Sequence, residues 1–467
     1  MAVELFQDFA LTGLFLLIGY ALRSKIKLFQ KLYIPAAVLG GIVGLLLGPE
    51  VLGKVSPVYL ELSEYIGNLA MPLLAIVFST QFIGAKFDKK IIGHSMSTCI
   101  LNCGTACLQV FLGLAIILFC QTIDEVPLGF GLMPFSGFYG EHGIGALAAS
   151  VYESLGHWTA DIALSVGNTF ATFGMLFGIT FGIIVINIAA RRGLILQDAG
   201  MQSMSEEDMS GFIPEEKRTA AVQMVTKNDA INPVAFQMAI IGSMLIVSYW
   251  LLDYLVLIPG FSGSAITIPC IFVGIAVAVI GKKTNLGRYL DKKSLTNTSG
   301  AALEFLIASS VASTKLSIFV TYGFELALLT VVILACTAFY VLFFGRMWHK
   351  ENWVENSLGT FGLATGVLAT GFLLIRVADP NTETTAATNL AIGNSISTLT
   401  VQMYMLMAMP TIIVNAPNVA IATCAIGLVV FTVGGCIGQR LRKRSSADRN
   451  MREKQTPCPC GGESVFG

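Results

Sequence analysis

Residues 135–145 read FSGFYGEHGIG, and residues 358–366 read LGTFGLATG. Both stretches lie among hydrophobic segments, at similar places in the two halves of the chain. Glycine disfavours helix, and irregular backbone is tolerated at membrane depth only where protein buries it or where it lines a cavity. Two broken segments in corresponding positions are the sequence pattern that best indicates a transporter's binding site. We therefore expect two re-entrant hairpins, at residues 128–152 and 356–378.

The composition indicates a membrane protein. The 467 residues are 54% hydrophobic and only 12% charged, with a mean hydropathy of +0.73. Soluble proteins carry about 25% charged residues. Apolar runs of spanning length recur from residue 5 to residue 438, which predicts an all-α polytopic fold in a lipid bilayer. The formal net charge of zero indicates no nucleic-acid partner.

The expected membrane helices number eleven and are separated by short loops. They lie at 5–22, 33–52, 66–84, 92–120, 161–189, 235–258, 264–281, 301–320, 324–345, 385–413 and 418–438. Basic residues follow helices 1, 3, 5, 7, 9 and 11, and the opposite loops hold little beyond Lys54 and Lys315. These clusters share one face only if both hairpins return to the side they enter. The positive-inside rule then places the N-terminus outside and the C-terminus in the cytoplasm.

Two pairs of motifs indicate an internal repeat. Residues 34–40 begin Ile-Pro and end in glycine, as do residues 268–274. LSVGNT at 164–169 is matched by LAIGNS at 390–395, and each follows a hairpin. The two halves begin on opposite sides, so we expect inverted-topology repeats of about five helices each. The expected parts are a first repeat (1–190), a cytoplasmic linker (191–234), a second repeat (235–413), an extra helix (414–440) and a basic cytoplasmic tail (441–467).

Inverted repeats bring two hairpin tips together near the membrane midplane. Broken helices there expose N–H groups for a carboxylate and carbonyls for a cation. The candidate solute-binding residues are Gly137, Gly140, Glu141, His142, Gly143, Gly145, Gly359, Gly362, Thr365, Gly366 and Arg376.

Three of these candidates have two interpretations each. Glu141 either binds sodium or a proton at the hairpin tip, or faces external water. His142 either contacts the solute or holds the hairpin turn. Arg376 either pairs with a solute carboxylate or pairs with Asp379 and reaches the cytoplasmic surface.

Oxygen-bearing side chains beside the hairpins are candidate sodium ligands, because hard cations prefer oxygen. They are Asn168, Thr169, Asn394 and Ser395. The alternative is that these side chains form hydrogen bonds between helices.

The cysteines and histidines do not indicate an enzyme. Cys99, Cys103 and Cys107 share one helix face, which favours a small-residue packing surface over a soft-metal site. Cys458 and Cys460 stay unassigned. We find no cofactor fingerprint, and the four histidines are scattered.

The chain resembles the bacterial sodium:glutamate symporter family through nearly all of residues 10–412. The resemblance rests on residues 33–41, on His142-Gly143-Ile144-Gly145-Ala146, on residues 171–174, on Lys315-Leu316 and on Phe361-Gly362. It implies sodium-coupled glutamate uptake across the bacterial cytoplasmic membrane, with sodium as coupling ion, two inverted halves and a homodimer. The chain departs from the family in the added Glu141, in a second hairpin without histidine, and in an eleventh helix beyond the family's ten.

The expected function is thus a sodium-coupled symporter that imports glutamate or a related carboxylate or amino acid by alternating access. The alternative is a proton- or sodium-coupled antiporter or exporter of another organic anion, and Glu141 is the residue that favours it. A channel fits less well, because paired hairpins without a repeated filter suit alternating access.

Overall fold

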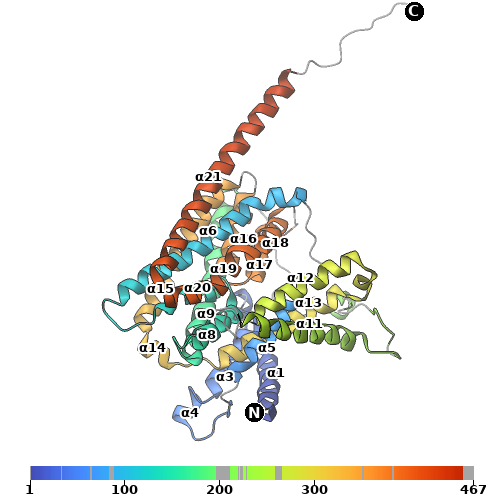
Figure 1. The fold of residues 1–467 in the computed structure, drawn as a ribbon, viewed down its shortest axis with the longest axis vertical. Coiled ribbons are helices and arrows are strands. Elements are labelled where there is room, and N and C mark those ends of the chain that lie inside the picture. Colours follow the sequence, from blue (N-terminus) through green and yellow to red (C-terminus); the bar gives the residue numbers. More distant parts are fainter. Residues whose placement is uncertain are drawn as a thin grey trace, which may run out of the picture.

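The computed structural model contains helices and no strands in the part of the chain it describes. It describes residues 2–32, 34–63, 66–81, 83, 89–195, 211–218, 220, 224–227, 229–257, 266–349, 352–380 and 383–455. Among these residues, eight helices are long and apolar enough to cross a membrane. The expectation of an all-α, multi-pass membrane protein is confirmed. Figure 1 shows the arrangement.

One set of helices, which we call the first helix group, comes from the first parts of the two halves. Its helices are α1 (Ala2–Lys25), α3 (Ala36–Leu47), α5 (Ala70–Thr80), α11 (Pro233–Leu255), α12 (Thr267–Lys283) and α13 (Lys292–Ala312). Helix α1 packs on α3, α3 packs on α13, and α5 packs on both α12 and α13. Short helices connect them: α2 (Lys27–Lys31), α4 (Leu52–Val55), η1 (Ile66–Leu69) and η5 (Asn285–Tyr289).

The second helix group contains the later parts of both halves. Its long helices are α6 (Lys89–Cys120), α9 (Ala160–Arg191), α15 (Gly323–Trp348), α18 (Ala386–Ser397) and α21 (Pro417–Gln455). Helix α6 packs on α15, α18 and α21. In Figure 1, α11, α12 and α13 of the first group lie to the right of these helices. The connection between the groups from α13 to α15 is the short helix α14 (Ser317–Thr321).

The two glycine-rich segments form pairs of short helices within the second group. The first pair is η2 and α7 (Leu128–Leu132, Met133–Phe138) followed by α8 (Glu141–Ser154). The second pair is α16 (Trp353–Thr365) followed by α17 (Leu368–Ala378). The longest of these helices has 14 residues, whereas a membrane crossing needs about 20. Each pair breaks at glycine, at Gly140 and at Gly366.

Close backbone contact explains two of the other glycines. A Cβ on Gly362 would lie 2.8 Å from the Cα of Gly371, so α16 and α17 touch through their backbones. A Cβ on Gly137 would lie 2.7 Å from the Gly167 carbonyl oxygen of α9. Glycine at these positions lets each short pair pack tightly.

The expected helix 66–84 consists of the 3-10 helix η1 and the shorter α5, and two further expected helices also differ from the structure. Helix 301–320 was placed too late, because Asp291 caps α13 through the N–H groups of Lys293 and Ser294 and the helix already ends at Ala312. The expected helix 385–413 is interrupted by a π-helix at Thr398–Gln402, which α19 (Met403–Met407) and α20 (Met409–Asn415) follow. In the first case the polar cap at Asp291 sets where the helix begins.

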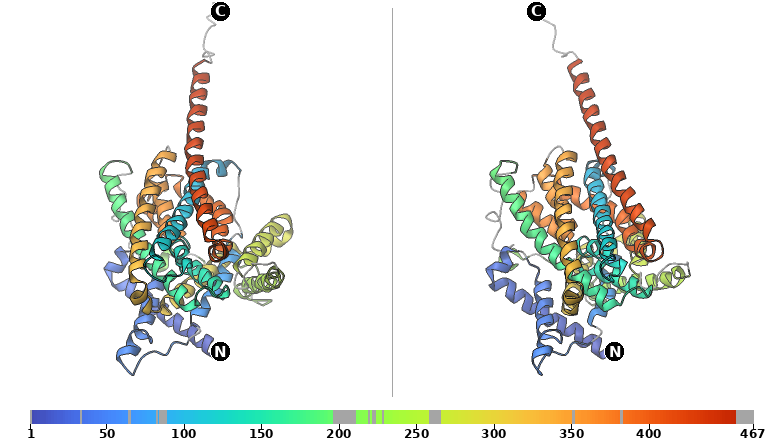
Figure 2. Two further views of the ribbon diagram at one scale, coloured as in Figure 1. Left: turned by 60° about the vertical axis from the view of Figure 1, so that its left-hand side comes forward. Right: turned by 90° about the vertical axis from the view of Figure 1, so that its left-hand side faces the viewer.

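The described part of the linker holds only the short helix η4 (Glu215–Lys217). At the other end, α21 runs to Gln455, well beyond the expected boundary at residue 440. Figure 2 shows its C-terminal part projecting past the rest of the molecule. Cys458 and Cys460 lie outside the described residues.

Candidate functional site

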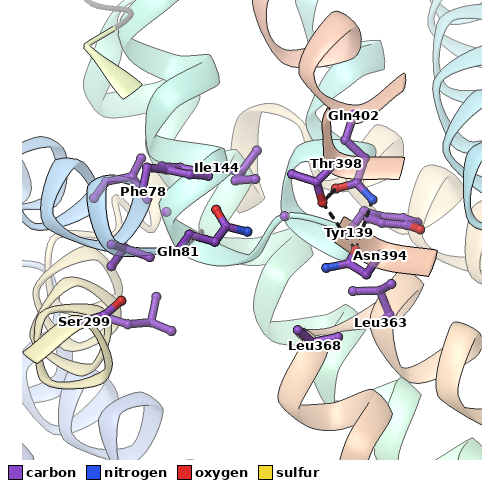
Figure 3. A pocket seen from close by; sticks show the side chains of 15 residues that line it. Phe78, Gln81, Tyr139, Ile144, Ser299, Leu363, Leu368, Asn394, Thr398 and Gln402 are labelled. Atoms are coloured by element: carbon purple, nitrogen blue, oxygen red, sulfur yellow. Dashed lines mark hydrogen bonds between the residues drawn. The ribbon is translucent and has the colours of Figure 1, made fainter. Parts of the chain in front are cut away.

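A cavity of about 220 Å³ lies where the two helix groups meet. The first group contributes Leu74, Val77, Phe78 and Gln81 at α5, with Ser299 and Leu303 of α13. The second group contributes residues of both glycine-rich pairs and of the segment from α18 into the π-helix. Figure 3 shows these side chains facing one space.

Both broken segments reach this cavity. Tyr139, Gly140, Gly143 and Ile144 line it from the first pair, and Leu363 and Leu368 line it from the second. The breaks at Gly140 and Gly366 end α7 and α16 beside the space instead of letting them continue through it. The structure therefore brings the two segments of sequence together, as the pattern predicts.

The polar corner of the cavity consists of Asn394, Thr398 and Gln402 (Figure 3). The Gln402 Nε2 donates to Asn394 Oδ1 at 3.3 Å, and the Thr398 Oγ1 donates to Gln402 Oε1 at 2.9 Å. A π-helix carries the second and third of these residues, and such segments recur at functional sites. The hydrogen bonds fix three polar side chains against the cavity.

The residues that line the cavity in the described structure are all uncharged. An anion in this space would meet neutral donors, namely the amides of Gln81, Asn394 and Gln402 and the hydroxyls of Ser299 and Thr398. Neutral donors hold a carboxylate through hydrogen bonds, and a cation bound nearby compensates its charge.

The candidates of the first segment fall into three classes. Gly140 and Gly143 line the cavity, whereas Gly137 and Gly145 pack against Gly167 of α9. His142 is 3% exposed and its Nε2 lies 3.2 Å from Thr172 Oγ1, so this side chain joins α8 to α9. The side chain of Glu141 lies outside what the structure describes.

The candidates of the second segment do not line the cavity themselves. Gly359 and Gly362 face α17, and the Thr365 hydroxyl donates to the Phe361 carbonyl at 2.8 Å. Gly366 ends α16. Arg376 is exposed on α17 and is not among the cavity residues. Their neighbours Leu363 and Leu368 line the space instead.

The four candidate sodium ligands lie in different surroundings. Asn394 belongs to the polar corner, while Ser395 donates to the Ala391 carbonyl on its own helix. Asn168 donates through Nδ2 to the carbonyl of Ser310 at 2.5 Å, away from the cavity lining. Thr169 donates to the Ser165 carbonyl at 2.8 Å.

Sequence reasoning missed Thr398, Gln402, Tyr139, Gln81 and Ser299. The sequence does contain a pattern that indicates Thr398 and Gln402. Asn394, Thr398 and Gln402 recur every four residues in an apolar run, which places them on one helix face. Gln81 and Ser299 come from helices that no motif connects to the hairpins, so only the packing of the two groups reveals them.

The cysteine face of α6 packs against neighbouring helices. A Cβ on Gly427 of α21 would lie 2.8 Å from Cys107 Sγ, and one on Gly393 of α18 would lie 3.0 Å from the Cys99 backbone nitrogen. Cys99, Cys103 and Cys107 are all buried. These contacts fit a packing surface for this face of α6.

Comparison with known proteins agrees with this architecture. The sequence model of the sodium/glutamate symporter family matches residues 1–370. A curated protein named sodium/glutamate symporter, from Haemophilus influenzae, is 24% identical over 385 residues, which cover 78% of this chain and 86% of that relative. The family match contains the first glycine-rich pair and α16, ends within α17, and stops before the polar corner at Asn394, Thr398 and Gln402.

Proposed function

Because the chain belongs to the sodium/glutamate symporter family, we propose that it is a sodium-coupled symporter that carries glutamate or a closely related amino acid or carboxylate. The observation that carries the proposal is the cavity between the two helix groups, to which both glycine-rich segments contribute. The curated relative bears the same activity in its name. This proposal assigns no enzymatic reaction to the chain and no cofactor beyond sodium as coupling ion.

The size and polarity of the cavity support a small solute. At about 220 Å³ it is smaller than the roughly 300–1,000 Å³ of drug-sized sites. Its apolar wall, with Phe78 and Leu303, suits the methylene groups of an amino acid, and its polar corner supplies donors for a carboxylate. We assign the solute's carboxylate to the Asn394–Gln402 corner.

Reciprocal packing supports two inverted repeats. Helix α3 of the first half packs on α13 of the second, and α12 of the second half packs on α5 of the first. Likewise α6 packs on α18, and α15 packs on α9. Each short helix pair is too short to cross the membrane twice at full width, which supports two re-entrant hairpins.

Alternating access follows from where the cavity lies. In this proposal the second helix group moves against the first, so that the solute is exposed to each side in turn. The boundary is mainly apolar, with Leu74 and Leu306 of the first group in one core with Phe138 of the second. Apolar surfaces can exchange partners without leaving buried polar groups unpaired, so the free-energy cost of such a movement stays small.

We further infer that the chain lies in the bacterial cytoplasmic membrane as a homodimer, with its N-terminus outside and α21 leading into the cytoplasm. The basic residues Arg440, Arg442, Lys443 and Arg444 at the cytoplasmic end of the last span support this orientation.

Transport by purified protein in liposomes tests the function. Radiolabelled glutamate should accumulate above its external concentration only when sodium is high outside, and a proton gradient at equal sodium should not replace it. Empty liposomes and dissipation of the sodium gradient with an ionophore are the controls. Glutamate uptake driven by protons alone, or sodium-driven uptake of another carboxylate without glutamate uptake, would contradict the assignment.

A further inference from the structure

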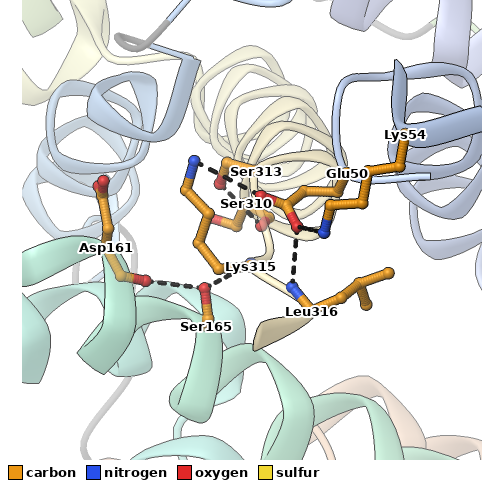
Figure 4. Close-up of polar contacts among 8 residues, drawn as sticks. All are labelled: Glu50, Lys54, Asp161, Ser165, Ser310, Ser313, Lys315 and Leu316. Atoms are coloured by element: carbon orange, nitrogen blue, oxygen red, sulfur yellow. Dashed lines mark hydrogen bonds and ion pairs between the residues drawn. The ribbon is translucent and has the colours of Figure 1, made fainter. Parts of the chain in front are cut away.

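Asn168 of α9 meets the C-terminal end of α13, where the two helix groups touch. Its Nδ2 donates to the Ser310 carbonyl at 2.5 Å and to Thr314 Oγ1 at 3.3 Å. One turn earlier, the Ser165 hydroxyl accepts a hydrogen bond from the Lys315 backbone N–H at 2.7 Å. Figure 4 shows the Ser165 contact and the position of Ser310 beside it. These bonds join the second group to the first.

Two oxygen atoms at this junction have no partner. Asn168 is 1% exposed and Ser310 is 0% exposed, yet Asn168 Oδ1 and Ser310 Oγ accept and donate no hydrogen bond within the described structure. Exchanging the positions of Oδ1 and Nδ2 by rotating the Asn168 amide would not give Oδ1 a partner, because Oδ1 would then face the Ser310 carbonyl oxygen. Buried oxygens of this kind are rare unless a water or an ion satisfies them.

The surroundings favour a cation. Helix α13 ends at Ala312, and the C-terminal end of a helix carries partial negative charge. The carbonyls of Ala312 and Ser313 accept no hydrogen bond from the described residues. Hard cations bind neutral oxygens of amides, hydroxyls and carbonyls, which are the groups present here. The Lys315 ammonium group is directed to Glu50, 3.8 Å from its Oε1, and does not occupy the junction (Figure 4).

We propose that Asn168 Oδ1 and Ser310 Oγ, with the carbonyl end of α13, form a sodium site that bridges the two helix groups. The inference rests on the proposed function and specifies where its coupling ion binds. Asn394, the repeat counterpart of Asn168, does not form a second such site, because its Oδ1 already accepts a hydrogen bond from Gln402 Nε2. In this proposal Asn168 binds the ion, whereas Asn394 lines the cavity.

The position of the site gives the ion an effect on conformation. Ligands come from α9 in one group and α13 in the other, so the site exists only while these helices are in contact. Sodium therefore stabilises this arrangement relative to any arrangement in which the groups have moved apart. Ser310 lies seven residues along α13 from Leu303 of the cavity, about 10 Å away, so ion and solute share one helix.

Sodium-dependent thermal stability of the purified full chain tests the site. The unfolding temperature is measured as sodium replaces choline at constant ionic strength, with no solute present. Wild type should show a saturable rise. Ser310→Ala should raise the sodium concentration for half-maximal effect by about tenfold, because one ligand to a charged group is lost. Ser309→Ala is the matched control, since its hydroxyl already donates to the Leu306 carbonyl on the same helix.

The outcomes separate the site from the function. If Ser310→Ala does not yield folded protein, Ser310→Cys keeps the volume but offers sulfur, a poor ligand for sodium, and should weaken sodium binding likewise. An unchanged sodium dependence in the folded variant would overturn the site and indicate bound water, whereas sodium-driven glutamate uptake in that same variant would leave the proposed function intact. Sodium stabilisation lost in Ser310→Ala but kept in Ser309→Ala supports the site.

Discussion

Gly145 of α8 and Gly167 of α9 lie backbone against backbone. A Cβ on Gly167 would be 3.0 Å from the Cα of Gly145, and a Cβ on Gly145 would be 3.3 Å from the Cα of Gly167. This contact seats the first glycine-rich pair on the helix that carries Asn168. It connects the cavity wall at Gly143 to the proposed ion site through two packed helices.

Gly167→Ala should destabilise the protein by about 1–3 kcal/mol, because the added methyl group lies 3.0 Å from the Gly145 Cα and the two helix backbones must separate to accept it. Thermal unfolding of the purified variant measures this. Gly300→Ala is the matched control, since a Cβ there meets nothing within 4 Å and α13 gains helix propensity, so its stability should stay equal or rise by up to about 1 kcal/mol. Equal stability of the two variants would show that the α8–α9 contact is not tight.

Gln402→Ala should raise the KM for glutamate uptake by about tenfold while folded protein is still recovered. The substitution removes a donor of the polar corner and the acceptor for Thr398 Oγ1. Initial rates in proteoliposomes measure the change. Thr400→Ala, an exposed residue of the same π-helix, should leave the KM unchanged. A wild-type KM in Gln402→Ala would show that the polar corner does not bind glutamate.

Thr172→Val should destabilise the protein by about 1–3 kcal/mol, because it leaves the buried His142 imidazole without its partner, and His142→Leu should cost less than this, because the Thr172 hydroxyl that it leaves is only half-buried. The double variant should lose less than the sum, since both partners are then apolar. The KM for glutamate should stay the same in every variant. A raised KM with unchanged stability would instead support solute contact by His142.

Acidification should weaken the first glycine-rich segment through His157. The Gly129 N–H donates to His157 Nε2 at 3.2 Å, and burial lowers the pKa of this imidazole from 6.5. The unfolded chain therefore binds more protons than the folded one below about pH 6.5, so stability is full above that pH and is lost as the pH falls toward the lower folded pKa.

The pH effect is measured as the unfolding temperature between pH 7.5 and 5. His157→Gln, whose side chain does not titrate, should flatten this part of the profile. Glu153→Gln, an exposed change nearby, should leave the profile as in wild type. If the unfolding temperature of His157→Gln depends on pH as in wild type, another group causes the pH dependence.

Local sequence patterns predicted most of the membrane helices and both broken segments. Long apolar runs such as 324–345 and 161–189 became α15 and α9 with bounds a few residues away. Prediction failed where hydrophobic run length does not set the helix geometry. Asp291 starts α13 before its apolar part, and the π-helix at Thr398–Gln402 interrupts a run that reads as one helix.

The candidate site was predicted only in part. Gly140 and Gly143 reach the cavity because a break in a helix is a local property that glycine encodes. Arg376 and His142 lie elsewhere because their side-chain direction depends on the turn of the helix and on what packs beside it. Gln81 and Ser299 could not be predicted, since their helices are distant in sequence from both broken segments.

By itself the sequence determined a helical membrane protein with two segments interrupted at glycine, because hydrophobic run length and backbone freedom act over a few neighbouring residues. Tertiary structure alone decided which residues face the shared cavity and which partners surround Asn168 and Asn394. Asn394 Oδ1 accepts a hydrogen bond from Gln402 Nε2 at 3.3 Å, while Asn168 Oδ1 has no hydrogen-bond partner within the described structure. The local sequences are similar, LSVGNT at 164–169 and LAIGNS at 390–395, so the difference comes from the residues that pack against each asparagine.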